Sequence, residues 1–136
     1  MDKTRLMDIA ILLVRVTVGV IMLTHGMQKL FGVFGGPGVK GFAGALGNMG
    51  FSATLFLAWA VALIETLGGI CLIAGIFPRA AAALIAAVMA VAIIKVHGSN
   101  GLFASNGGFE YPLLIFAVCI SILLTGGGKF SAYNRF

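Results

Sequence analysis

This chain has few charged residues. Charged residues make up 10% of its 136 residues, and only four of them are acidic. Soluble domains usually carry about 25% charged residues. Hydrophobic residues make up 60% of the chain. This balance excludes an ordinary soluble domain and indicates a membrane protein. The net charge of +5 does not indicate a nucleic-acid partner, because the basic residues are scattered singly along the chain.

Several motifs for chemistry are missing as well. The two cysteines, Cys71 and Cys119, lie in apolar stretches and form no CxxC pair, so we expect small buried hydrophobes and no thiol–disulfide centre. The glycine-rich segment 31–50 lacks the Walker pattern of a phosphate-binding loop. The two histidines and the two inner carboxylates lack a local ligand spacing. We therefore expect no metal site and no cofactor held by the chain itself.

Four apolar stretches fill most of the sequence. A helix that crosses the hydrocarbon core needs about 20 residues, with about 17 near the lower limit. The sequence predicts such helices at about 9–31, 54–77, 79–97 and 109–126. The expected fold is an all-α membrane protein, a four-transmembrane-helix bundle that forms a single domain over residues 1–136.

Two long loops separate these stretches. In the first loop, apolar residues recur at helical spacing from Val39 to Met49. This pattern predicts a short amphipathic segment that lies on the membrane surface or folds back over the bundle. Basic residues are distributed five against three between the two sides of the predicted topology: Lys3, Arg5, Arg79, Lys129 and Arg135 on one, and Lys29, Lys40 and Lys95 on the other. This bias favours cytoplasmic termini.

Glu65 is a carboxylate in the middle of the second apolar stretch. A charge at that depth costs about 2.5–3.5 kcal/mol on insertion scales, and such groups normally face the bundle interior and find a partner. Other polar residues gather near the predicted outer ends of the helices. The candidate ligand-binding or proton-handling residues are His25, Gln28, Lys29, Glu65, Lys95, His97 and Glu110. No catalytic residue is assigned.

Pairing among these groups follows from their predicted depth. We expect Glu110 to pair with Lys95 or Lys29, and Glu65 to pair with Arg15 or His25, which makes Arg15 a structural ion-pair candidate. Two points stay open. The polar residues near helix ends can take part in a site, or they can simply extend their side chains to the membrane interface. Glu65 can form a structural bond between helices, or it can handle a proton or ligand.

Four segments carry a resemblance to a known family. They are HGMQKLFG at 25–32, ETLGG at 65–69, NGGFEYP at 106–112 and GGGKFS at 126–131. In this order and spacing the chain resembles DoxX-type membrane proteins. The resemblance implies a four-helix protein of the bacterial inner membrane, and it extends over nearly the whole chain.

The resemblance also sets the functional expectation. It implies an accessory or anchoring subunit of a redox- or stress-related complex, linked to quinone or sulfur chemistry, rather than an enzyme in itself. If the protein is an enzyme, it is expected to be a quinone-linked oxidoreductase subunit. The expected partners are the lipid membrane, a redox subunit or soluble enzyme, and a second copy of the chain. The alternative is a small proton-coupled transporter that acts through buried Glu65.

Overall fold

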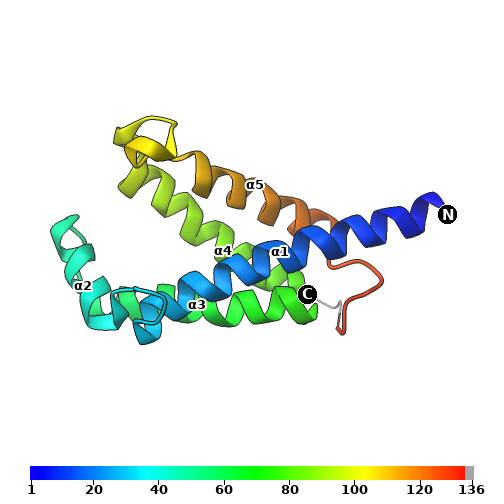
Figure 1. Ribbon diagram of the computed structural model, residues 1–136, viewed down its shortest axis with the longest axis horizontal. Coiled ribbons are helices and arrows are strands. Elements are labelled where there is room, and N and C mark those ends of the chain that lie inside the picture. Colours follow the sequence, from blue (N-terminus) through cyan, green and yellow to red (C-terminus); the bar gives the residue numbers. More distant parts are fainter. Residues whose placement is uncertain (134–136) are drawn as a thin grey trace.

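The protein is all-helical in the computed structural model (Figure 1), which describes residues 1–133, so Arg135 lies outside the described residues. The α-helices are α1 (Lys3–Phe31), α2 (Gly38–Asn48), α3 (Thr54–Ala74), α4 (Pro78–Val91) and α5 (Glu110–Thr125). The π-helical segment η1 (Ala92–His97) and the 3₁₀ turn η2 (Gly98–Asn100) extend α4, and η3 (Ala104–Asn106) precedes α5. Residues 1–133 contain no β-strand, only an isolated bridge between Ile76 and Tyr133.

Three of these helices are long and apolar enough to cross a membrane. They are α1, α3 and the continuous helix Pro78–Asn100. The predicted all-α fold with membrane-suited helices is therefore confirmed. The predicted number of four membrane-crossing helices is not confirmed, because α5 has only 16 residues. The bundle also contains a fifth α-helix, the short α2. The helix α2 occupies the place of the predicted amphipathic segment.

The helices form two pairs, α1 with α3 and α4 with α5. A tight turn joins the pairs: Gly75, in the left-handed conformation, ends α3 and donates its N–H to Cys71 O, and Pro78 begins α4. Away from this turn the two pairs diverge, toward the end that carries α2 and the loop before α5 (Figure 1). The two helix pairs therefore meet at the end that carries the turn, the closed end, and enclose a wedge-shaped space at the opposite, open end.

Small residues bring α1 and α3 into close contact. A Cβ atom on Gly19 would lie 2.9 Å from Gly69 O, and one on Gly26 would lie 2.9 Å from the Glu65 carbonyl carbon. In lipid such close packing replaces the hydrophobic effect as the main attraction between helices. The two glycines, seven residues apart on one face of α1, therefore fix its register against α3.

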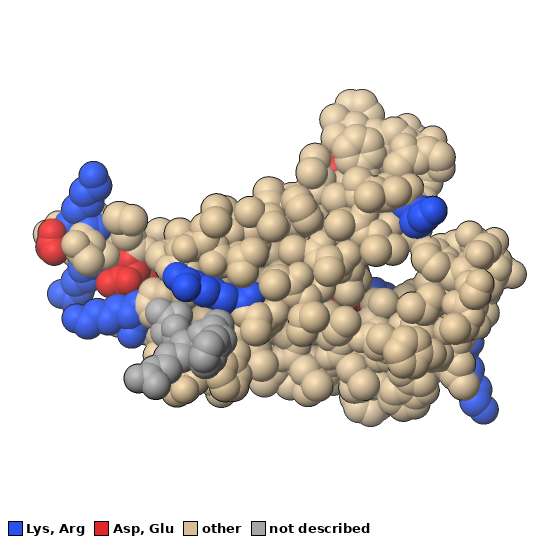
Figure 2. Space-filling view, turned by 180° about the vertical axis from the view of Figure 1, so that it is seen from behind, with Lys and Arg blue, Asp and Glu red and all other residues tan. Residues whose placement is uncertain are grey.

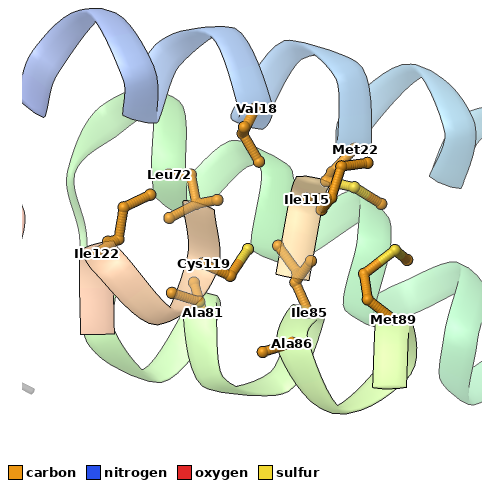
Figure 3. Packing of buried hydrophobic residues seen from close by; sticks show 11 residues of the cluster. Val18, Met22, Leu72, Ala81, Ile85, Ala86, Met89, Ile115, Cys119 and Ile122 are labelled. Carbon is orange, nitrogen blue, oxygen red and sulfur yellow. The ribbon is translucent and has the colours of Figure 1, made fainter. Parts of the chain in front are cut away.

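The apolar core lies where the two pairs join. Figure 3 shows Met22 of α1, Ile85 of α4 and Ile115 of α5 pointing into one cluster. The buried members are Val18, Met22, Leu72, Ala81, Ala82, Ile85, Ala86, Met89, Ile115, Cys119 and Ile122. On the face seen in Figure 2, most Lys and Arg side chains lie toward the two ends, and few charged atoms are visible between them. This arrangement suits a bundle surrounded by hydrocarbon.

Candidate ligand-binding site

A cavity of about 650 Å³ opens in the wedge between the two helix pairs. Small-molecule sites usually measure about 300–1,000 Å³ and are mainly apolar with a few placed polar groups. Apolar side chains from all the long helices line this cavity, and Phe42 and Leu46 of α2 lie over it. Its polar side chains are His25, Lys29, Glu65, His97 and Tyr111. Figure 2 shows this end of the molecule hollowed between two lobes.

An ion pair forms part of the cavity wall. Lys29 Nζ lies 2.6 Å from Glu65 Oε1 and 2.7 Å from Oε2. The side chain of Glu65 is 1% exposed and that of Lys29 is 23% exposed. A carboxylate this far from water is costly to bury alone, and the ammonium group of Lys29 supplies its partner.

Helix geometry explains why these two residues meet. Gly26 packs against the backbone of Glu65 and Thr66, which sets that level of α1 beside Glu65. Lys29 lies one turn farther along α1. Side chains tilt toward the N-terminus of their helix, and because α1 and α3 run in opposite directions, the two side chains tilt toward each other.

The predicted partners of Glu65 were therefore wrong. Arg15 lies 11 residues before Gly26, about 16 Å farther along the helix axis at 1.5 Å per residue. The ring of His25 instead lies beside that of Tyr111, with 6.0 Å between centroids.

Arg15 is fully buried at the closed end of the bundle. Its Nη2 donates to Phe130 O at 3.2 Å, while Nε and Nη1 have no hydrogen-bond partner within residues 1–133. Among residues 1–133 no carboxylate pairs with it, so the prediction of an ion pair for Arg15 was wrong. Arg15 instead holds the segment that follows α5.

The helix α2 lies at the open end of the molecule, where it contacts α3 and α1 (Figure 1). Val39, Ala43 and Leu46 pack with Ala58 at the start of α3. Phe42 lies against the ion pair, with Lys29 Nζ 5.1 Å from its ring centroid. A cation over an aromatic face gains about 0.5–2 kcal/mol, depending on desolvation. The α2 helix thus contributes to the environment of Lys29 as well as to the cavity wall.

His97 ends the π-helical segment η1 and lines the cavity. Its Nδ1 lies 2.7 Å from Gly107 O. A carbonyl oxygen only accepts, so Nδ1 carries the proton in this contact, and in the neutral ring Nε2 is then an acceptor. π-Helical turns often occur at functional sites, and here the turn precedes a loop that fixes the orientation of the ring.

Three predicted site residues lie outside the cavity wall. Lys95 is exposed, Glu110 accepts a hydrogen bond from Ala104 N at 2.9 Å, and Gln28 Nε2 donates to Phe34 O at 3.1 Å. Glu110 and Gln28 therefore organise the two long loops. The predicted pairing of Glu110 with Lys95 or Lys29 was also wrong, since within the described chain Lys29 pairs with Glu65.

Three aromatic residues of the site were missed. Phe42, Phe51 and Tyr111 line the cavity. The available signal for Tyr111 was its place in the first turn of α5, directly after Glu110. For metal ions, the described residues contain no group of three or more His, Cys, Asp or Glu side chains that could hold one.

Apolar helices of membrane-crossing length, around an apolar cavity with a buried ion pair, define a membrane protein with a candidate ligand site. The DoxX family model matches residues 10–98, more than half of the chain, and the chain belongs to the DoxX family. The resemblance in the sequence motifs is thereby confirmed.

A curated relative points to the same family. The chain is 30% identical over 129 residues to a protein of Bacillus subtilis (strain 168) named "Putative oxidoreductase CatD". The match covers 95% of this chain and 87% of that protein. No solved structure matches the chain significantly.

Proposed function

We propose that this protein is a multi-pass subunit of the bacterial plasma membrane that binds a quinone for a redox partner. In this proposal four helices cross the membrane in one domain, α5 being the fourth, and both termini are cytoplasmic. The subunit anchors or assists a quinone- or sulfur-linked redox complex. The printed name of the Bacillus relative, an oxidoreductase, supports the redox class.

The observation that carries the proposal is the apolar cavity with the Lys29–Glu65 pair in its wall. A quinone is a flat apolar ring with two carbonyl acceptors. Lys29 and Tyr111 offer donors beside an apolar wall, and His97 lies at the same wall. When bound, a quinone accepts electrons and protons, and groups of this kind can position and supply protons.

The electron source in this proposal is another protein. The sequence has no motif for haem, flavin or an iron–sulfur cluster. The loops at the open end, fixed by Gln28, His97 and Glu110, give a defined surface beside the cavity where a partner subunit or soluble enzyme could dock.

A proton-coupled transporter remains the alternative function for Glu65. Such a carboxylate must exchange protons during transport. Lys29 Nζ lies 2.6 Å from Glu65 Oε1, so this ion pair would have to open for proton exchange. A bound ligand can leave the pair in place, which favours ligand binding over transport.

Quinone binding to the purified protein in lipid nanodiscs tests the proposal. We expect saturable binding that Lys29→Gln weakens by about tenfold, since a hydrogen bond to a charged group contributes about 1.5–3 kcal/mol. Lys40→Gln, on the exposed face of α2, is the matched control and leaves binding unchanged. Native protein that binds no quinone would contradict the proposal. Uptake driven by a pH gradient in proteoliposomes, lost in Glu65→Gln, would support the transporter instead.

The proposed orientation has its own test. Single cysteines placed at Ser99 and at Thr4, in a background without Cys71 and Cys119, should react with an impermeant thiol reagent from opposite sides. Labelling of Ser99 from the periplasmic side agrees with cytoplasmic termini, and labelling of Thr4 from that side would reverse the orientation.

A further inference from the structure

The cavity continues into a groove between α3 and α4. A second hollow of about 330 Å³ lies beside it, lined by residues of these two helices and by Phe77 of the turn. Ile64 and Leu84 line both hollows. The two spaces therefore adjoin, and together they follow α3 and α4 from the open end of the wedge toward the turn.

The edge of the groove is formed by one face of α4. Leu84, Ala87 and Val91 line the cavity and are exposed at the molecular surface. Their spacing of three and four residues places them on one side of the helix. Leu57, Val61 and Ile64 form a matching row on α3. The opening between the two rows is thus lined by apolar side chains.

Polar groups lie away from this opening. Those of the cavity come from α1, η1, the start of α5 and the inward face of α3. The second hollow has no charged side chain among its lining residues. The combined space is therefore amphipathic, with an ion pair at one wall and an apolar channel leading away from it.

From this arrangement we infer that the ligand is a membrane-dissolved amphiphile that enters sideways between α3 and α4. Its polar ring lies near Lys29, and its hydrocarbon tail occupies the α3–α4 groove. Both flanking helices are of membrane-crossing length, so the opening faces hydrocarbon. From Ala80 to Val91 the groove follows about 16 Å of helix, at 1.5 Å per residue. The inference rests on the proposed quinone site and adds the requirement for a tailed quinone.

Two ligands and two tryptophan variants test the inference in nanodiscs. The ligands are a benzoquinone without a tail and the same ring carrying an alkyl tail of about ten carbons. Ala87→Trp fills the opening with a large side chain, and Ala83→Trp places the same side chain on an exposed part of α4 outside both hollows. Thermal unfolding checks that each variant is folded, and Ala87→Phe replaces Ala87→Trp if that variant is not.

We expect Ala87→Trp to weaken binding of the tailed quinone by about tenfold and to change binding of the ring by less than about twofold. Ala83→Trp changes neither. If Ala87→Trp leaves the tailed quinone unaffected, or weakens both ligands equally, the sideways entrance is wrong while the quinone site stands. If neither ligand binds the native protein, the proposed function fails and the inference fails with it.

Discussion

Lys29 donates to both carboxylate oxygens of Glu65, at 2.6 and 2.7 Å, although the residues lie 36 positions apart on separate helices. The two ends of this pair are not equivalent. Glu65 is 1% exposed, whereas Lys29 is 23% exposed and also touches the ring of Phe42. Removing one partner should therefore affect the fold differently from removing the other.

Substitution of Lys29 should be the more damaging change. Lys29→Met leaves a fully buried carboxylate without a partner, and breaking a buried pair in this way costs about 3–5 kcal/mol. Glu65→Gln keeps an acceptor for Lys29, whose long side chain can also shift toward solvent. We expect the melting temperature in detergent to fall more for Lys29→Met than for Glu65→Gln.

The apolar double variant is the control for this order. Lys29→Met combined with Glu65→Leu removes both charges and should recover much of the loss, because replacing a whole buried pair is often neutral. Glu65→Leu alone should be worse than Glu65→Gln, because it leaves Lys29 without an acceptor. Equal losses for Glu65→Gln and Glu65→Leu would speak against a stabilising bond.

Gly26 sets the level at which α1 meets Glu65. A Cβ on this residue would collide with the backbone of Thr66 and Glu65, neither of which can move without shifting α3. We expect Gly26→Ala to separate the helices, to lower the free energy of unfolding by about 2–4 kcal/mol, and to weaken quinone binding.

Gly44 provides the matched substitution. A Cβ there meets nothing within 4 Å, and Gly44 lies in the middle of α2. Gly44→Ala should be neutral or stabilise by about 0.5–1 kcal/mol through helix propensity. If both alanine variants melted at the same temperature, close packing at Gly26 would not be what holds α1 against α3.

The sequence predicted the helices better than the contacts of their side chains. Apolar length alone located α1, α3 and α4, and the pattern from Val39 onward located α2. These are local properties, set by burial along one element. α5, predicted at about 109–126, begins at Glu110 and ends at Thr125, whereas α1 begins at Lys3, six residues before its predicted start.

The partner of Glu65 could not be predicted from depth along the helices alone. Depth made Arg15 and His25 plausible partners, and Lys29 was expected to pair with Glu110 or to reach the interface. What decided the pairing was the contact of Gly26 with α3 together with the opposite tilt of the two side chains. The π-helical turn that orients His97 had no sequence signal at all.

Glu110 and Tyr111 are neighbours in sequence with different roles. Glu110 holds the loop through Ala104 N, outside the cavity wall, whereas Tyr111 lines the cavity. Tyr111→Phe removes only a hydroxyl and should weaken quinone binding by about threefold to tenfold, the effect of one hydrogen bond. Glu110→Gln keeps the acceptor and should leave the dissociation constant within about twofold. The reverse order would place the ligand at the loop instead of in the cavity.

Arg15 ties the segment after α5 to the closed end of the bundle. Its Nη2 donates to Phe130 O, Lys129 N donates to Asp8 Oδ1, and Tyr133 N donates to Gly75 O. Two other guanidinium atoms of Arg15 lack partners among residues 1–133, so the cost of burying this charge offsets much of what its one hydrogen bond contributes.

We therefore expect Arg15→Met to change the free energy of unfolding by less than about 1 kcal/mol and yet to release the segment. Limited trypsin digestion followed by mass spectrometry should show faster cleavage after Lys129, which is exposed. Arg5→Met, an exposed arginine on the same helix, should leave that rate unchanged. If Arg15 tethers the segment, cleavage after Lys129 accelerates while the free energy of unfolding changes little. A large loss of stability with unchanged cleavage would instead mean that Arg15 stabilises the helices and not the segment.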